Sequence, residues 1–108
     1  MLDSDVLLKI YSAGCFPMWD EVNEETEVFR PDPRAIIELD HFHVPRRLGK
    51  RIRQRPFRIT TDLEFEAVMD ACHEARDDGC WCSPEMEVAY LELHERGFAH
   101  SVEAWRDD

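Results

Sequence analysis

Residues 79–105, GCWCSPEMEVAYLELHERGFAHSVEAW, carry the signals for a helix with two defined ends. Ser83 is a good N-cap because its hydroxyl can accept a hydrogen bond from a free amide of the first turn, and Pro84 suits the first helical position. Gly97 can adopt the left-handed backbone conformation that ends a helix. The stretch therefore predicts a helix that begins at Pro84 and stops at Gly97, followed by a strand that starts at His100.

Two aromatic residues of this stretch, Trp81 and Tyr90, form the first candidate site. Trp81 lies in a short loop just before the helix, and loops carry functional residues more often than cores do. A nucleobase stacked on an aromatic ring gains about 1–3 kcal/mol, and the gain depends little on which base it is. The alternative is that these rings fill a hydrophobic core. We expect Trp81 to be available for base stacking.

Outside this stretch, helix and strand patterns alternate along the chain. Leu7, Ile10 and Tyr11 recur at helical spacing, whereas Phe57–Thr61 alternates and is rich in β-branched residues. The pattern predicts an α+β fold, with a small, mostly antiparallel sheet packed with three to four helices. The other predicted elements are a helix over 4–13, an extended turn over 16–19, a surface loop over 20–26, strands over 27–30, 34–39 and 57–61, a helix that opens at Pro45 and ends before Pro56, a helix over 64–75 capped by Asp62, and a turn over 77–79.

The charge distribution is uneven. The net charge of −11 argues against a nucleic-acid partner, yet seven of the 13 Lys and Arg residues lie between Arg46 and Arg58 without an intervening Asp or Glu. Salt screens the distant acidic charge within about 10 Å, so this basic strip can dock on a phosphate backbone locally. The alternatives are an ordinary solvated helix face and a contact with an acidic protein. The basic strip consists of Arg46, Arg47, Lys50, Arg51, Arg53, Arg55 and Arg58.

The length of 108 residues predicts a single small domain. An acidic N-terminal start and the lack of a long apolar run argue against a signal peptide or a membrane span, so we expect a cytoplasmic location with reduced cysteines. Cys72-His73 and Cys80-x-Cys82 could be read as a zinc set. Structural zinc sites favour wider spacing within a Cys pair, so we expect thiols and no metal. The cysteines are Cys15, Cys72, Cys80 and Cys82.

Two further sets of polar residues are expected to have structural roles. His94, His100, Glu95 and Glu103 could suggest acid–base chemistry, but no motif with a nucleophile or phosphate loop accompanies them. For the histidine on the helix face, His94, we expect packing or a local hydrogen bond. The Pro31-Asp32-Pro33-Arg34 motif predicts a rigid corner with an Asp–Arg pair.

Four separated motifs resemble the leucyl/phenylalanyl-tRNA–protein transferases. They occur in the family's order and close to its spacing, and together they cover the chain from about Leu7 to Trp105. The motifs are Gly14-Cys15-Phe16-Pro17-Met18, Pro31-Asp32-Pro33-Arg34-Ala35, the run from Phe42 to Arg47, and the stretch from Gly79 to Trp105.

The resemblance implies an activity and a domain plan. Members move Leu or Phe from aminoacyl-tRNA to the N-terminal Arg or Lys of an acceptor protein, which marks that protein for degradation by the N-end rule. No cofactor is implied, and we expect a monomer. Residues 1–108 match the N-terminal domain, whereas the proposed catalytic residues of the family lie in a C-terminal, acetyltransferase-like domain without a counterpart here. The implication is a docking domain that is inactive alone; the alternative is a free-standing module that binds the acceptor end of tRNA or another RNA without catalysis.

The resemblance also implies residue roles. Trp81 matches the tryptophan that stacks the terminal adenosine, and Tyr90 matches a tyrosine near that pocket. We expect the second stacking side chain to be Phe16, Met18 or Trp19. The residues expected to contact the tRNA backbone are Arg46, Arg47, Lys50, Arg51, Arg53 and Arg55, of which Arg53 and Arg55 are the preferred candidates.

Overall fold

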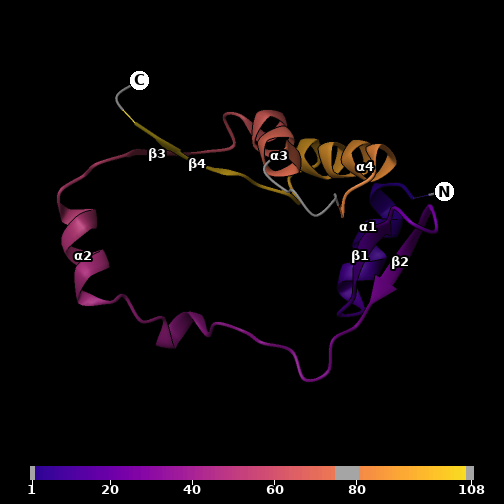
Figure 1. Cartoon of the computed structure of the whole chain (residues 1–108), viewed down its shortest axis with the longest axis horizontal. Coiled ribbons are helices and arrows are strands. Elements are labelled where there is room, and N and C mark those ends of the chain that lie inside the picture. The colour runs from indigo at the N-terminus through magenta and orange to yellow at the C-terminus, as the bar shows by residue number, and fades with distance from the viewer. Residues whose placement is uncertain (1, 75–80, 107–108) are drawn as a thin grey trace.

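A computed structural model of the chain describes residues 2–74 and 81–106. Its core lies where helix α4 (Pro84–Glu95) contacts both α1 (Ser4–Ser12) and α3 (Phe65–Glu74) (Figure 1). Apolar residues at helical spacing on α4 supply most of the buried side chains, together with one leucine of α1. The core cluster is Leu7, Cys82, Met86, Ala89, Tyr90 and Leu93.

The predicted ends of α4 are confirmed. The Ser83 hydroxyl accepts a hydrogen bond from the Met86 amide at 3.1 Å, and Pro84 is the first helical residue. Gly97 has a φ of 84°, which a residue with a Cβ atom rarely adopts. The start of α4 is therefore fixed in position, and so is the loop that precedes it.

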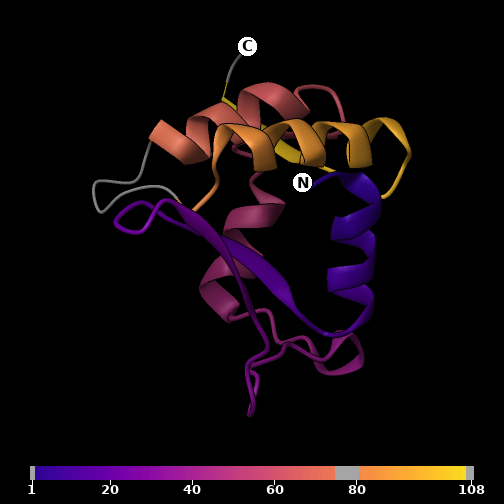
Figure 2. The ribbon, with the colours of Figure 1, turned by 90° about the vertical axis from the view of Figure 1, so that its right-hand side faces the viewer.

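The strands form two separate antiparallel ribbons. β1 (Phe16–Asp20) pairs with β2 (Glu25–Phe29), and β3 (Arg58–Thr61) pairs with β4 (Val102–Trp105). The predicted α+β class is confirmed, but the expected single sheet is divided in two, and the expected turn over 16–19 is strand β1. Figure 2 shows the first ribbon beside α1 and below α4.

Three local predictions were wrong. Residues 34–39 contain no strand, because their apolar side chains have no strand to pair with: Ile36 and Ile37 are 74% and 72% exposed, and a short 3₁₀ turn, η1 (Leu39–His41), follows. Asp62 does not cap α3; it has a φ of 59°, and its carboxylate accepts from the Ser101 amide at 3.0 Å. Arg34 does not pair with an aspartate; it donates to the Gly14 carbonyl at 3.3 Å. The turn predicted over 77–79 lies outside the described residues.

The segment between the two ribbons extends away from the core. It contains α2 (Arg46–Arg53), and none of its residues from 30 to 55 is buried. Figure 1 shows it as a wide sweep from β2 through α2 to β3. The radius of gyration is 16.5 Å, compared with about 13 Å for a compact domain of this length. This extended arm positions the basic strip at a distance from the core.

Candidate nucleic-acid interface

Trp81 is held at the start of α4 by a backbone contact and a ring contact. The Trp19 amide of β1 donates to the Trp81 carbonyl at 2.6 Å, which fixes the loop against the first ribbon. The Trp81 indole meets the Tyr90 ring at 78°, with the ring centroids 6.1 Å apart. Such edge-to-face contacts are favourable because the positive ring edge meets the negative ring face. The loop and α4 thus orient Trp81 together.

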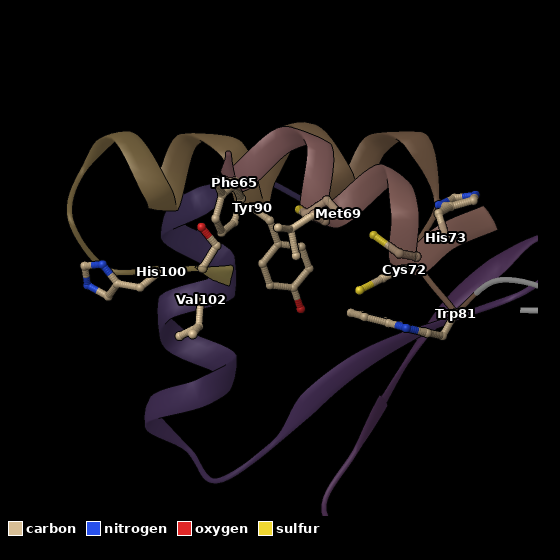
Figure 3. Close-up of a pocket in the computed structure, with 11 residues that line it drawn as sticks. Phe65, Met69, Cys72, His73, Trp81, Tyr90, His100 and Val102 are labelled. Atoms are coloured by element: carbon tan, nitrogen blue, oxygen red, sulfur yellow. The ribbon is translucent and has the colours of Figure 1, made fainter. Parts of the chain in front are cut away.

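An apolar pocket of about 290 Å³ lies beside these two rings (Figure 3). Phe65 and Met69 of α3 and Val102 of β4 line it together with Trp81 and Tyr90. The volume is just below the range of roughly 300–1,000 Å³ that is typical of sites for drug-sized ligands. A pocket of this size and polarity suits one flat ring system such as a nucleobase.

The hydroxyl of Tyr90 has a partner on a different helix. Tyr90 is only 9% exposed, and its hydroxyl oxygen lies 2.6 Å from that of Tyr11 on α1. Burial, together with this hydrogen bond, raises the pKa of Tyr90 well above its ordinary value of 10.0. The phenol therefore remains protonated at neutral pH. Tyr11 was expected only as part of the apolar face of its helix, because no local signal links residues 79 positions apart.

The remaining aromatic candidates divide between the two faces of β1. Side chains alternate along a strand, so Phe16 and Met18 lie on one face and Trp19 on the other. Trp19, like Trp81, packs against the core cluster, but it does not line the pocket. Phe16 instead stacks on Phe29 at 6.0 Å. The structure thus brings Trp81, Tyr90 and Trp19 together, and it directs Phe16 and Met18 away from them.

The basic strip is separate from the pocket. Figure 1 shows α2 on the opposite side of the molecule from the start of α4. Arg46, Arg47, Lys50, Arg51 and Arg53 are all exposed, and within the described part of the chain no carboxylate forms an ion pair with them. The last member of the strip differs, because the Arg58 guanidinium lies 5.3 Å from the centre of the Trp105 ring. The strip thus presents free positive charge on α2 and in Arg55.

A polar network just before the first residue of β4 centres on Asp62. His100 Nδ1 lies 2.8 Å from its carboxylate, and this hydrogen bond lowers the pKa of Asp62 and raises the pKa of His100. His94 Nδ1 lies 2.8 Å from the Ala99 carbonyl, and Ser101 donates to Glu103. The latter hydrogen bond is the main reason why the pKa of Glu103 is lowered. The local hydrogen bond expected for His94 is confirmed; the pairing of His100 with Asp62, 38 positions away, was missed.

The residues considered for zinc are only partly described. Cys72, His73 and Cys82 line the pocket, whereas Cys80 lies outside the described residues. Among the residues that the structure describes, no three His, Cys, Asp or Glu side chains are arranged to hold a metal ion. None of the helices in residues 2–74 and 81–106 has the length and apolar character needed to cross a membrane.

The structure thus combines an α+β fold with an aromatic-lined pocket and a separate, exposed basic helix. The chain belongs to the leucyl/phenylalanyl-tRNA protein transferase family, whose model matches residues 36–108. The resemblance seen in the four sequence motifs is thereby confirmed.

Relatives in three bacteria carry the name leucyl/phenylalanyl-tRNA–protein transferase. The chain is 45% identical to the protein of Pseudomonas fluorescens (strain Pf0-1), and the match covers 96% of this chain and 46% of the relative. It is 42% identical to the protein of Salinibacter ruber, over 98% of this chain and 46% of the relative. It is 44% identical to the protein of Zymomonas mobilis, over 100% of this chain and 41% of the relative. The chain thus spans less than half the length of these relatives.

Proposed function

We propose that this chain is the tRNA-docking part of an aminoacyltransferase that moves Leu or Phe from aminoacyl-tRNA to the N-terminal Arg or Lys of a protein. Membership of the family supports the reaction class. The observation that carries the docking role is the position of Trp81, edge-on to Tyr90 beside an apolar pocket and hydrogen-bonded through its backbone to β1. The terminal adenosine of tRNA is single-stranded, so its base is free to stack on this indole.

The chemistry requires little from this half of the enzyme. The α-amino nitrogen of the acceptor protein attacks the ester carbonyl carbon of the aminoacyl-tRNA. A peptide bond forms, the bond to the terminal ribose oxygen breaks, and that oxygen receives the proton lost by the amine. The ester is already activated, so we expect no cofactor. The enzyme must hold two substrates in the reactive geometry and stabilise the oxyanion, and we assign no catalytic residue to this chain.

The basic strip supplies the second part of the docking surface. Exposed guanidinium groups that have no carboxylate partner among the described residues are well suited to phosphate oxygens, and we propose that one tRNA acceptor arm contacts both the strip and the pocket. We expect the backbone contacts from Arg46, Arg47, Lys50, Arg51, Arg53 and Arg55. We also propose a monomer that works in the cytoplasm, where aminoacyl-tRNA is used in translation.

A transfer assay tests whether this chain binds aminoacyl-tRNA without catalysing the transfer. Labelled leucine on leucyl-tRNA is offered to a peptide with an N-terminal arginine, and the full-length Pseudomonas fluorescens relative serves as the active control. We expect no transfer by the 108-residue chain, although it retains measurable affinity for leucyl-tRNA. Transfer by this chain alone would contradict the proposal, because the catalytic groups would then lie within it.

A substitution of Trp81 tests the stacking role. Loss of a base–aromatic stack of about 1–3 kcal/mol should raise the Kd for leucyl-tRNA roughly 5- to 150-fold in Trp81→Ala, and much less in Trp81→Phe, which keeps an aromatic ring. Phe98→Ala is the matched control, since Phe98 is 59% exposed and does not line the pocket. Equal affinities for all four proteins would favour a basic strip that contacts an acidic protein instead.

A further inference from the structure

Tyr11 is a surface residue with a contact that reaches the candidate site. It is 44% exposed at the end of α1, and its hydroxyl oxygen lies 2.6 Å from that of the buried Tyr90 on α4. We propose that Tyr11 is a positioning residue, which holds the ring of Tyr90 and thereby keeps the indole of Trp81 oriented with a face open to a nucleobase. The inference rests on the proposed function, because it assigns Tyr11 a role in the same base-stacking site.

The contacts form a continuous path of three side chains. The Tyr90 ring is attached to α4 at one end, and its hydroxyl is held by Tyr11 at the other, so the long axis of the ring is fixed at both ends. Trp81 meets that ring at 78°. An edge-to-face contact depends on the relative position of the two rings, so a tilt of the Tyr90 axis would change the support for Trp81. The backbone hydrogen bond from Trp19 fixes the Trp81 loop but not its side chain.

The position of α1 does not depend on the Tyr11 hydroxyl. Arg96 donates to Ser4 at 2.8 Å and to Asp5 at 3.0 Å, and Leu7 is fully buried against α4. Removal of one hydroxyl should therefore leave the helix in place. The role assigned to Tyr11 is thus separable from the packing of α1.

The protonation of the pair makes its effect independent of pH in the neutral range. Burial raises the pKa of Tyr90, so its phenol stays neutral at pH 6–8. One hydroxyl then donates to the other throughout this range. Loss of the hydrogen bond should therefore have the same effect at pH 6 and pH 8.

The test uses a short RNA with 2-aminopurine in place of its 3′-terminal adenine, because stacking on an indole quenches this fluorophore. In Tyr11→Phe we expect the Kd to rise roughly two- to tenfold and the quenching at saturation to decrease. Tyr90→Phe removes the same hydrogen bond, so the double variant should be no weaker than either single variant. Ser12→Ala is the control, because it removes an exposed hydroxyl from the next position of α1.

A measurement without ligand separates this inference from the proposed function. The indole Nε1–H NMR signal of Trp81, identified by its loss in Trp81→Phe, should shift in Tyr11→Phe, while that of Trp105, which donates to Thr60, should not. An unchanged Trp81 signal, or additive effects of the two tyrosine substitutions on Kd, would overturn the positioning role. If the Trp81 signal shifts in Tyr11→Phe but Trp81→Ala binds RNA as tightly as the native chain, Tyr11 still positions Trp81. The stacking function would then be contradicted.

Discussion

Asp62 shows how one residue can connect segments that lie far apart in the chain. Its left-handed backbone, with a φ of 59°, follows β3 directly and turns the carboxylate toward the segment before β4. That carboxylate accepts from the Ser101 amide at 3.0 Å and from His100 at 2.8 Å, and His94 Nδ1 lies 3.8 Å away. Nearby, His94 stacks on Phe65 with centroids 4.2 Å apart. These contacts join the end of β3 to the segment before β4, and they hold α3 against α4 beside it.

The pKa directions at this site predict a pH dependence of stability. Folding raises the pKa of His100 above its ordinary 6.5, so its contribution is complete below that value and is lost as the pH rises through the raised pKa. Folding lowers the pKa of Asp62 below 3.8, so its contribution is present above that value and is lost as the pH falls through the lowered pKa. The His100–Asp62 pair therefore stabilises the fold most between about pH 3.8 and pH 6.5, which are the ordinary pKa values of the two groups.

Urea unfolding of the native chain and His100→Gln over a range of pH measures this contribution. The difference in free energy of unfolding should be largest near pH 5 and should shrink as the pH rises through the raised pKa of His100. A difference of equal size at every pH would mean that His100 contributes by packing or by an uncharged hydrogen bond.

At the scale of single elements, predictions from sequence succeeded where the determining signals are local. Both ends of α4 follow from Ser83, Pro84 and Gly97, which act on the adjacent turn alone. Ile36 and Ile37 have strand propensity, yet a strand forms only with a partner, and sequence pattern does not identify one. The same limit applies to the site: Trp81 and Tyr90 lie nine residues apart on one capped helix and its loop, whereas Tyr11 comes from another element.

The basic strip makes its own prediction at this scale. Each phosphate contact that is lost should reduce the slope of log K against log salt by about 0.7–0.9, because fewer counterions are released. Replacement of Arg53 and Arg55 together by Gln should therefore flatten the salt dependence of tRNA binding by roughly two such steps. Replacement of Lys9 and Arg30 together by Gln is the charge-matched control, since both are exposed and lie outside the basic strip. Equal slopes for all variants would show that these side chains do not contact phosphate.

The whole molecule divides into a packed part and an extended arm. Buried side chains come from α1, β1, α4, β4 and adjacent residues, whereas residues 30–55 are exposed almost throughout and include large apolar side chains such as Leu39 at 91%. A segment with few buried contacts opens at low free-energy cost. The radius of gyration of 16.5 Å reflects the same division.

Limited proteolysis checks this division. Trypsin should cleave first after basic residues between positions 30 and 58, and only later after Arg96, which bonds to Ser4 and Asp5 of α1. Bound tRNA should slow the early cuts, because it covers the basic strip. Initial cleavage after Arg96 would contradict the assignment of the arm as the least stable part of the fold.

The most direct test of the central claim removes the base that Trp81 is proposed to stack. Binding to tRNA with and without its 3′-terminal adenosine is compared for the native chain and Trp81→Ala. We predict that loss of the adenosine raises the Kd of the native chain by about 5- to 150-fold and leaves that of the variant unchanged, since both changes remove the same stack. Equal affinity of the native chain for the two tRNAs would contradict the account.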